Sequence, residues 1–207
     1  MADGLPEIYL MRHCKTAWNR EGRIQGSIDM PLCPEGVAEA ASVLRSIQAF
    51  RFERIVSSPY RRARQTAGVL AKGLAIPMET LDDLRELDHG DWEGQRIETL
   101  MQTPASPYAA WFRDPSGNRI PGGSETVCEA QTRVVEAVKD TARRYAKGRI
   151  LVVLHKHIRA LLNCHLNGRR LAAFGLFVQD SITPQKIAAA QLQRLFAEFE
   201  ETIENHP

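Results

Sequence analysis

Three short apolar runs divide the chain, and stretches with helical periodicity lie between them. The runs comprise Ile8–Met11, Ile55–Val56 with its flanking residues, and Ile150–Leu154. Short continuous runs of this kind indicate buried strands. Strands that alternate with helices are typical of an α/β fold with a largely parallel sheet. The pattern therefore predicts an α/β fold for this chain.

The helical stretches each carry one apolar face. The first helix is predicted from Pro34 to Phe50, because proline is favoured in the first turn of a helix. Its inward face would comprise Val37, Ala41, Leu44 and Ile47. Further helices are predicted after Pro59, from about Thr126, and directly after His155. Thr126 and Glu129 have the spacing of a capping box, which would mark the start of the helix there.

Two segments depart from this alternation. Residues 95–123 hold four prolines, with Trp111 and Phe112 between them, and we expect an excursion that covers a site rather than a second domain. After Pro184, apolar residues at three- and four-residue spacing predict an amphipathic helix at about 184–203, which could pack on the domain or mediate a homodimer. Neither a repeat nor a linker is evident, so one domain spanning residues 1–207 is expected.

The composition excludes several classes of protein. With 27 basic and 25 acidic residues, the net charge of +2 argues against a protein that coats nucleic acid. No apolar run approaches the roughly 20 residues that span a bilayer, and the first residues lack the pattern of a secretory signal. The cysteines share no metal-ligand spacing, which is typical of reduced thiols in a cytoplasmic protein. We therefore expect a cytoplasmic location and neither a nucleic-acid nor a membrane partner.

Side chains that can bind an anion follow each predicted strand. They are Arg12 and His13 after the first, Arg62 after the second, and His155 after the third. Ligands of open α/β sheets bind at the carboxyl ends of the strands, where these residues would meet. Arginine supplies planar pairs of donors to phosphate oxygens. A single histidine is more often packed or solvated than catalytic, so the pattern alone predicts only an anion-binding site.

Short motifs surround these residues and follow one another as far as Leu161. They comprise Leu10–Asn19, Arg23–Gly26, Asp29–Leu32, Gly36, Ser57–Ser58, Arg62–Ala63, Gln65–Ala67, Leu84–Glu86, Gly90–Gly94, Pro121–Gly123, His155 and Ile158–Leu161. Each motif alone is weak evidence, but the ordered set resembles the histidine phosphatase superfamily, also called phosphoglycerate mutase-like proteins. The resemblance implies the fold of that family, a three-layer α/β sandwich with a largely parallel central sheet flanked by helices.

The resemblance also implies a catalytic mechanism. His13 would attack phosphorus and become transiently phosphorylated. Arg12, Arg62 and His155 would hold the phosphoryl oxygens and stabilise the charge of the transition state. Glu86 would protonate the leaving oxygen and then activate water. The remaining positions implied to bind substrate are Thr16, Asn19, Gln25, Gly26 and Lys156.

The implied enzyme is a phosphoric monoester hydrolase of the histidine acid phosphatase type, acting on a small phosphorylated metabolite. This mechanism requires neither a metal nor a cofactor. A phosphoglycerate mutase is one alternative, although cofactor-dependent mutases generally carry a longer and more basic insertion after the block that holds Glu86. A catalytically impaired binding protein is another, because Cys14 replaces the family's glycine and Lys156-His157 replaces two small residues. The same change leaves open whether His155 or His157 enters the site, and the strand-end position favours His155.

A different phosphatase chemistry also fits part of the sequence. His13-Cys14, followed by five residues and Arg20, matches the His-Cys-x5-Arg pattern of cysteine-dependent phosphatases. That loop surrounds phosphate with backbone N–H groups and calls for glycine. The five residues here contain no glycine and include the bulky Trp18. The histidine mechanism is therefore preferred.

Overall fold

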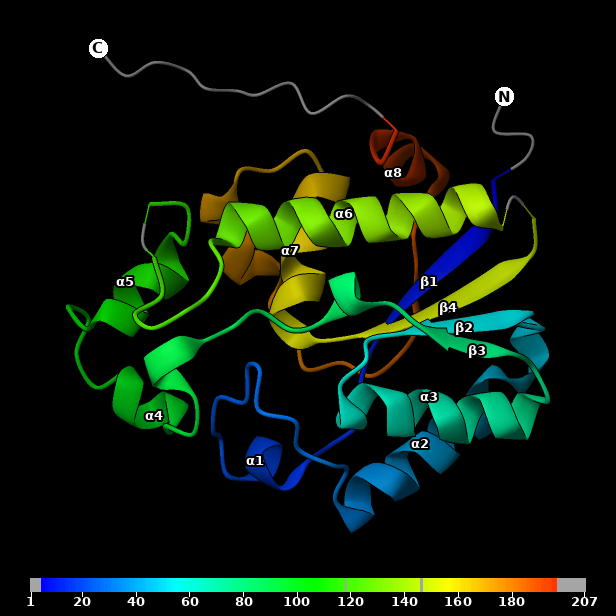
Figure 1. Ribbon diagram of the computed structural model, residues 1–207, viewed down its shortest axis with the longest axis horizontal. Helices are drawn as coiled ribbons and strands as arrows, with labels where there is room; N and C mark the ends of the chain where they lie inside the picture. The colour runs from blue at the N-terminus through cyan, green and yellow to red at the C-terminus, as the bar shows by residue number, and fades with distance from the viewer. Residues whose placement is uncertain (1–4, 118, 146, 197–207) are drawn as a thin grey trace.

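The computed structural model describes residues 5–117, 119–145 and 147–196, and a five-stranded sheet lies at its centre (Figure 1). The strands are β1 (Glu7–Arg12), β2 (Arg54–Ser57), β3 (Met78–Thr80), β4 (Arg149–Leu154) and β5 (Gln185–Lys186). Their order across the sheet is β3-β2-β4-β1-β5. All neighbouring pairs are parallel except β1 and β5, which are antiparallel. The prediction of a largely parallel sheet is therefore confirmed.

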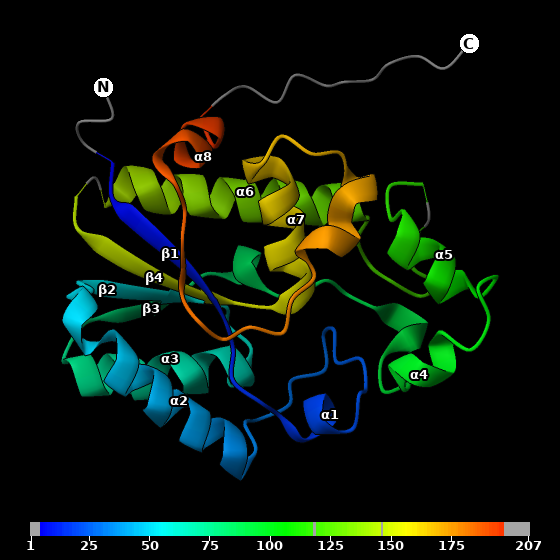
Figure 2. The same ribbon diagram turned by 180° about the vertical axis from the view of Figure 1, so that it is seen from behind.

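Helices cover both faces of the sheet (Figures 1 and 2). On one face, α2 (Pro34–Ile47) and α3 (Arg61–Leu74) pack against strand residues that include Met11, Ile55 and Val153. On the other face, α6 (Val127–Arg144) and α7 (Lys156–Leu166) pack against the alternate positions, such as Leu10, Val56 and Val152. Successive strand residues point to opposite faces, so strands buried on both sides are apolar throughout. The three-layer sandwich is confirmed.

The remaining helical segments are short. They are α1 (Ala17–Arg20), α4 (Ile97–Leu100), α5 (Pro107–Arg113) and α8 (Ala189–Arg194), with the 3-10 turns η1 (Gln48–Phe50), η2 (Asp82–Leu84), η3 (Gly90–Trp92) and η4 (Leu171–Phe177). The predicted capping box is present at the start of α6, where Thr126 Oγ1 accepts from the backbone N–H of Glu129 at 3.2 Å. The backbone N–H of Thr126 in turn donates to Glu129 Oε2 at 2.7 Å.

The predicted inward face of α2 is correct at Ile47 and displaced by one residue at the other three positions. Its buried positions are Gly36, Ala40, Val43 and Ile47, whereas Val37 is 49% exposed. Gly36 lies so close to the loop after β1 that an added Cβ would come within 2.0 Å of the carbonyl oxygen of Lys15. This close backbone approach turns the helix toward Gly36 and leaves Val37 at the surface. The α-helix also ends at Ile47, before the predicted end at Phe50, and continues as η1.

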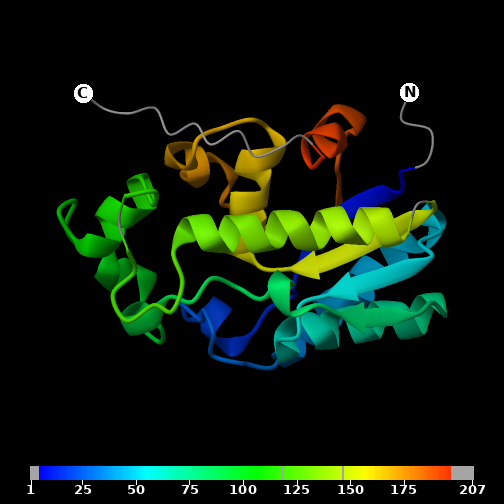
Figure 3. The same cartoon turned by 45° about the horizontal axis from the view of Figure 1, so that its top comes forward.

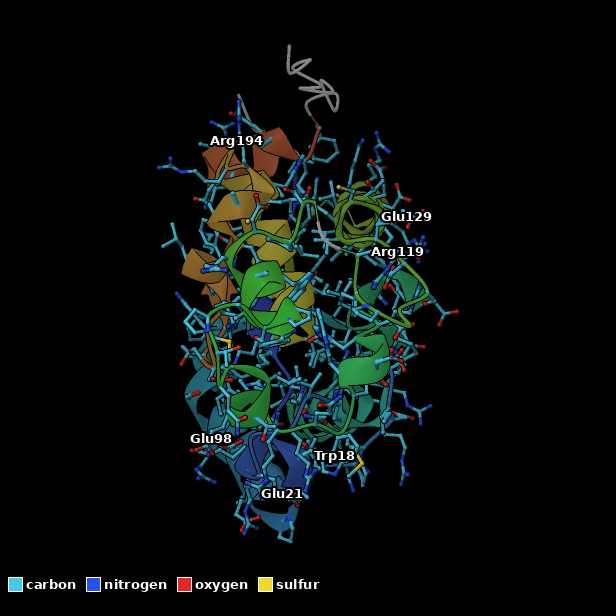
Figure 4. All side chains as sticks on the ribbon, turned by 90° about the vertical axis from the view of Figure 1, so that its left-hand side faces the viewer. Trp18, Glu21, Glu98, Arg119, Glu129 and Arg194 are labelled. Carbon is cyan, nitrogen blue, oxygen red and sulfur yellow. The ribbon has the colours of Figure 1, made fainter. Side chains whose placement is uncertain are left out.

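The excursion at residues 95–123 forms α4 and α5 at one end of the molecule (Figure 3). It contacts the loop after α1, where the backbone N–H of Ile97 donates to the carbonyl of Gly22 at 2.8 Å. Figure 4 accordingly shows Glu98 and Glu21 at the same end. Trp111 is fully buried, with ring centroids 5.5 Å from Trp92 and 5.4 Å from Phe174. The aromatic residues of the excursion are therefore part of the core.

The segment after Pro184 differs from the prediction. It begins as β5, in which Lys186 pairs with Tyr9 and Gln185 with Leu10 of β1, and the helix α8 starts only at Ala189. A two-residue edge strand carries too little pattern to be recognised beside the helical spacing that follows it. The rest of the predicted helix, residues 197–203, lies outside the described residues. Within the described ranges, the structure has no helix that is long and apolar enough to cross a membrane.

Candidate active site

A cavity of about 480 Å³ lies at the carboxyl ends of β1, β2 and β4. This volume is typical of pockets for small molecules. Eight of the predicted site residues line it: Arg12, His13, Asn19, Gln25, Gly26, Arg62, Glu86 and Lys156. Thr16 and His155 do not line it, although both contact residues that do. Strand ends that are distant in sequence therefore bring most of the predicted set together.

His13 follows β1 and is only 4% exposed. Its Nδ1 atom lies 2.7 Å from the carbonyl oxygen of Cys14. Because a carbonyl can only accept, Nδ1 carries the proton and Nε2 keeps its lone pair. Burial, reinforced by the charges of Arg12 and Arg62, holds the pKa of His13 well below its ordinary value. His13 is therefore neutral, with a nucleophilic nitrogen left for the cavity.

Arg62, in the first turn of α3, is fixed by three bonds to the protein. Its Nε donates to His155 Nδ1 at 3.2 Å, and its terminal nitrogens donate to the carbonyls of Ile28 and Gly26 at 2.8 and 2.7 Å. Gly26 has a positive φ of 53°. A guanidinium has five N–H groups, so one on each terminal nitrogen remains for an anion. Arg62 is thus a rigid, two-pronged donor.

His155 holds the guanidinium of Arg62 in place through a hydrogen bond. Since arginine can only donate, His155 Nδ1 accepts and Nε2 carries the proton, which it donates to Ser58 Oγ at 2.7 Å. Burial lowers the pKa of His155 well below its ordinary value, so the ring is neutral. Both ring nitrogens are occupied by protein groups in this structure. A contact between His155 and a phosphoryl oxygen therefore stays a prediction.

Thr16 orients two amide side chains that line the cavity. Its hydroxyl lies 3.0 Å from Gln25 Oε1 and 3.1 Å from Asn19 Oδ1, and its backbone N–H donates to Asn19 Oδ1 at 3.0 Å. These contacts occupy the amide oxygens. Among the described residues, neither amide nitrogen has a hydrogen-bond partner. The two NH2 groups are therefore the ends that remain for a ligand.

Glu86 is held at the amino terminus of α7. One carboxylate oxygen accepts from the backbone N–H groups of Leu87 and Ile158, each at 3.0 Å, and the other accepts from that of His157 at 3.2 Å. Unpaired N–H groups at a helix start are a natural site for a carboxylate. The side chain is 6% exposed and lines the same cavity as His13. Its position relative to α7 is therefore fixed by backbone atoms.

Arg12 and Lys156 meet at a residue that the sequence analysis did not single out. Arg12 Nη1 donates to Asp180 Oδ1, and Lys156 Nζ donates to Asp180 Oδ2 at 3.0 Å. Partial burial raises the pKa of Asp180, but Arg12 and Lys156 outweigh it and hold the pKa below its ordinary value. The Nε atom of Arg12 is buried without a partner among the described residues. Asp180 therefore pairs with the guanidinium of Arg12, which a bound phosphate group would also need.

Comparison with known proteins identifies the family. Residues 8–194 match the model of the Histidine phosphatase superfamily (branch 1). The chain belongs to this superfamily. Phosphoserine phosphatase 1 of Hydrogenobacter thermophilus is 27% identical over 175 residues, which cover 84% of this chain and 82% of that protein. Adenosylcobalamin/alpha-ribazole phosphatase of Salmonella typhimurium is 31% identical over 160 residues, with coverages of 77% and 78%.

A solved structure shows the same likeness. The phosphoserine phosphatase of Entamoeba histolytica, in complex with 3-phosphoglyceric acid, superposes with a TM-score of 0.75 at 25% identity. The match covers 87% of this chain and 89% of that chain. The family fold and the ordered motifs in the sequence therefore agree.

Cys14, which departs from the family's glycine, does not enter the cavity of this histidine phosphatase family member. Its side chain is fully buried between β1 and the helices α2 and α3, and its backbone N–H donates to Thr66 at 3.0 Å. Burial raises the pKa of the thiol to about 12. Arg20 lies at the surface, where it pairs with Glu35 at 2.9 Å. The cysteine-dependent alternative is therefore wrong in its geometry.

Two further histidines of this family member form a buried pair in the cavity wall. His89 Nε2 lies 2.7 Å from His157 Nδ1, and both residues line the cavity. Burial lowers the pKa of His89 to about 4 and that of His157 well below its ordinary value, so both rings are neutral. The sequence analysis considered His157 and passed over His89. The position of His89 between Glu86 and the Gly90–Gly94 motif was the signal that could have found it.

Proposed function

We propose that this protein hydrolyses a small phosphomonoester through a phosphohistidine on Nε2 of His13. One observation carries the proposal: Nδ1 of His13 is committed to the Cys14 carbonyl, so a neutral nucleophilic nitrogen is left beside Arg12, Arg62 and Glu86. A neutral imidazole with a fixed tautomer needs no base to remove a proton before it attacks. The cations beside it match the charge of a phosphoryl group.

In the first step, the Nε2 lone pair attacks phosphorus while the P–O bond to the leaving group breaks. Arg62 offers its two free N–H groups to the phosphoryl oxygens, and Arg12 turns its guanidinium from Asp180 toward them. The amide NH2 groups of Asn19 and Gln25 add neutral donors. Glu86 takes up a proton when the substrate phosphate binds beside it, and it gives that proton to the leaving oxygen. The products are an alcohol, a phosphorylated His13 and a Glu86 carboxylate.

In the second step, water takes the place of the alcohol, and the proton now moves toward Glu86 instead of away from it. The Glu86 carboxylate takes a proton from water as the water oxygen attacks phosphorus and the P–N bond breaks. Inorganic phosphate leaves, His13 regains its lone pair, and Glu86 is again a carboxylic acid. The backbone N–H groups that hold Glu86 keep one carboxyl group in place for both transfers.

The cavity wall supports hydrolysis over a mutase reaction. From the described part of the excursion at 95–123, the side chain that lines the cavity is the apolar Ile97, and no arginine of that segment takes part. A mutase must hold a substrate with a second phosphoryl group, which calls for further cations. Lys15 and Arg23 also line the cavity, but they are paired with Glu39 and Glu21. The volume of about 480 Å³ favours a small metabolite. The phosphatases among the relatives, for phosphoserine and for alpha-ribazole, support the same reading.

The first test is the release of inorganic phosphate from a panel of small phosphomonoesters without added metal. We expect turnover by the wild type, a loss of at least about a thousandfold in His13→Ala, and near wild-type rates in His165→Ala, whose side chain lies at the far end of α7. Rapid acid-free quenching with radiolabelled substrate should trap label that is stable in alkali and labile in acid. Appreciable turnover by His13→Ala would contradict the proposal.

A further inference from the structure

The carboxylate of Asp180 lies in the wall of a cavity whose cations are suited to binding an anion. Asp180 contacts Arg12 and Lys156, the two cations nearest to it in the cavity wall. Like charges in such a wall oppose each other, so Asp180 weakens the binding of any purely anionic ligand. Asp180 is 69% exposed, yet both of its carboxylate oxygens pair with cations that line the cavity. The position of Asp180 therefore calls for a functional explanation.

The backbone on both sides of Asp180 is anchored. Arg159 of α7 is 2% exposed and donates to the carbonyls of Gln179 and Ser181 at 2.7 and 2.9 Å. These two carbonyls flank Asp180 in the segment between η4 and β5, which passes the carboxyl end of β1 (Figure 2). A buried guanidinium that donates hydrogen bonds to two neighbouring carbonyl groups restricts the movement of the loop. Asp180 is thus held over the cavity by the fold and not by its ion pairs alone.

Phosphate binding changes the partners of Asp180. In the proposed mechanism, Arg12 turns its donors to the phosphoryl oxygens, and the carboxylate is then left beside a phosphate dianion with Lys156 alone. Separation of the two anions would require the anchored loop to move. A cationic group on the substrate removes the conflict, because it takes the place that Arg12 leaves and neutralises Asp180.

We propose that Asp180 selects phosphomonoesters whose carbon skeleton carries an ammonium group close to the ester oxygen. Esters of amino alcohols, with or without a further carboxylate, have this chemistry. Lys156 lies on the other side of Asp180 and is placed to pair with a carboxylate of the same substrate. This inference deepens the proposed function and rests on it. It concerns the substrate class and not the steps of phosphoryl transfer.

Four esters test the inference as two matched pairs. Phosphoserine and 3-phosphoglycerate differ by an ammonium in place of a hydroxyl group, as do phosphoethanolamine and the monophosphate of ethylene glycol. We expect a higher kcat/KM for the ammonium member of each pair. In Asp180→Asn this preference should fall about three- to tenfold in both pairs, a size typical of a partly exposed ion pair, and Asp180→Glu should restore part of it. Equal rates within each pair of the wild type would overturn the inference.

The control and a second readout separate this inference from the proposed function. Asp140→Asn removes a comparably exposed carboxylate that pairs with Arg143 on α6, and it should leave both preferences unchanged. Dissociation constants of the four esters with His13→Ala report selection without turnover. Hydrolysis of all four esters with no ammonium preference, in rate or in binding, refutes only the role of Asp180. An ammonium preference in binding, without hydrolysis by the wild type, supports Asp180 and refutes the phosphatase.

Discussion

Nε of Arg62 lies 3.2 Å from Nδ1 of His155, so the imidazole of His155 holds the Arg62 guanidinium in place. The bond fixes the tautomer of His155 and the plane of the Arg62 guanidinium together. Ser58 completes the chain by accepting from His155 Nε2 at 2.7 Å. The ends of β2 and β4 and the start of α3 are thereby linked beside the cavity.

Removal of this support should impair catalysis more than binding of the whole substrate. In His155→Ala, Arg62 loses one of its three protein partners and its two free N–H groups can turn away from the phosphoryl oxygens. We expect kcat to fall about 10- to 100-fold with a much smaller change in KM, because small displacements of a positioned donor are costly. The measurement is steady-state phosphate release, with His165→Ala as the matched control. A change below twofold would contradict the role assigned to His155.

The role of Glu86 should depend on the leaving group. Protonation matters greatly for an alkyl alcohol and little for nitrophenolate, which leaves readily without a proton. In Glu86→Gln we expect kcat to fall about 10²- to 10⁴-fold on an alkyl phosphate and much less on p-nitrophenyl phosphate. The exposed Glu98→Gln on α4 serves as the control. Equal losses on both substrates would indicate that Glu86 is not the proton donor.

Stability should fall in mild acid because four buried histidines are neutral. Burial lowers the pKa of His13, His155 and His157 well below the ordinary value of 6.5, and that of His89 to about 4. Below about pH 6.5 these histidines bind protons in the unfolded chain but stay neutral in the native state. The unfolding free energy therefore decreases as the pH falls. Each such proton contributes about 1.4 kcal/mol per pH unit.

This dependence can be measured by urea denaturation between about pH 7.5 and pH 4.5. The unfolding free energy should be nearly constant above pH 7 and fall below pH 6.5. His89→Gln should lower the slope by about one proton, whereas Cys128→Ser should leave it unchanged. A stability that rises on acidification through this range would show that these rings are charged in the native state.

Cys14 should be inert and dispensable for catalysis. Its thiol is fully buried and burial raises its pKa to about 12, whereas Cys128 is exposed. We expect a thiol reagent to modify Cys128 quickly and Cys14 only on unfolding. Cys14→Ser should keep phosphate release within a fewfold of the wild type, while burial of the hydroxyl lowers the unfolding free energy by about 1–3 kcal/mol. Loss of activity at unchanged stability would revive the cysteine mechanism.

Sequence patterns predicted the central strands and the site residues on them because both have strong local signatures. β1, β2 and β4 are buried on both faces and therefore apolar. Arg12 and His13 lie at the end of β1, and Arg62 lies in the first turn of the helix that follows β2. The edge strands β3 and β5 were missed, since three or two partly exposed residues carry no periodicity. Asp180 was missed for another reason. Residues 179–183 resemble a segment of the family, but the contact of Asp180 with Arg12 depends on the bonds of Arg159 to this loop, which are tertiary contacts that the sequence does not show.

The parallel pairing of β1 with β4 joins segments that are far apart in the chain, with Arg12 opposite Leu154. During synthesis, His13 leaves the ribosome long before β4 exists to hold it. Among the described residues, the partner of its backbone N–H is the carbonyl of Leu154, at 3.0 Å. Formation of the cavity therefore coincides with the last central strand joining the sheet, and a nascent or truncated chain that lacks β4 carries His13 without the residues that surround it in the folded protein.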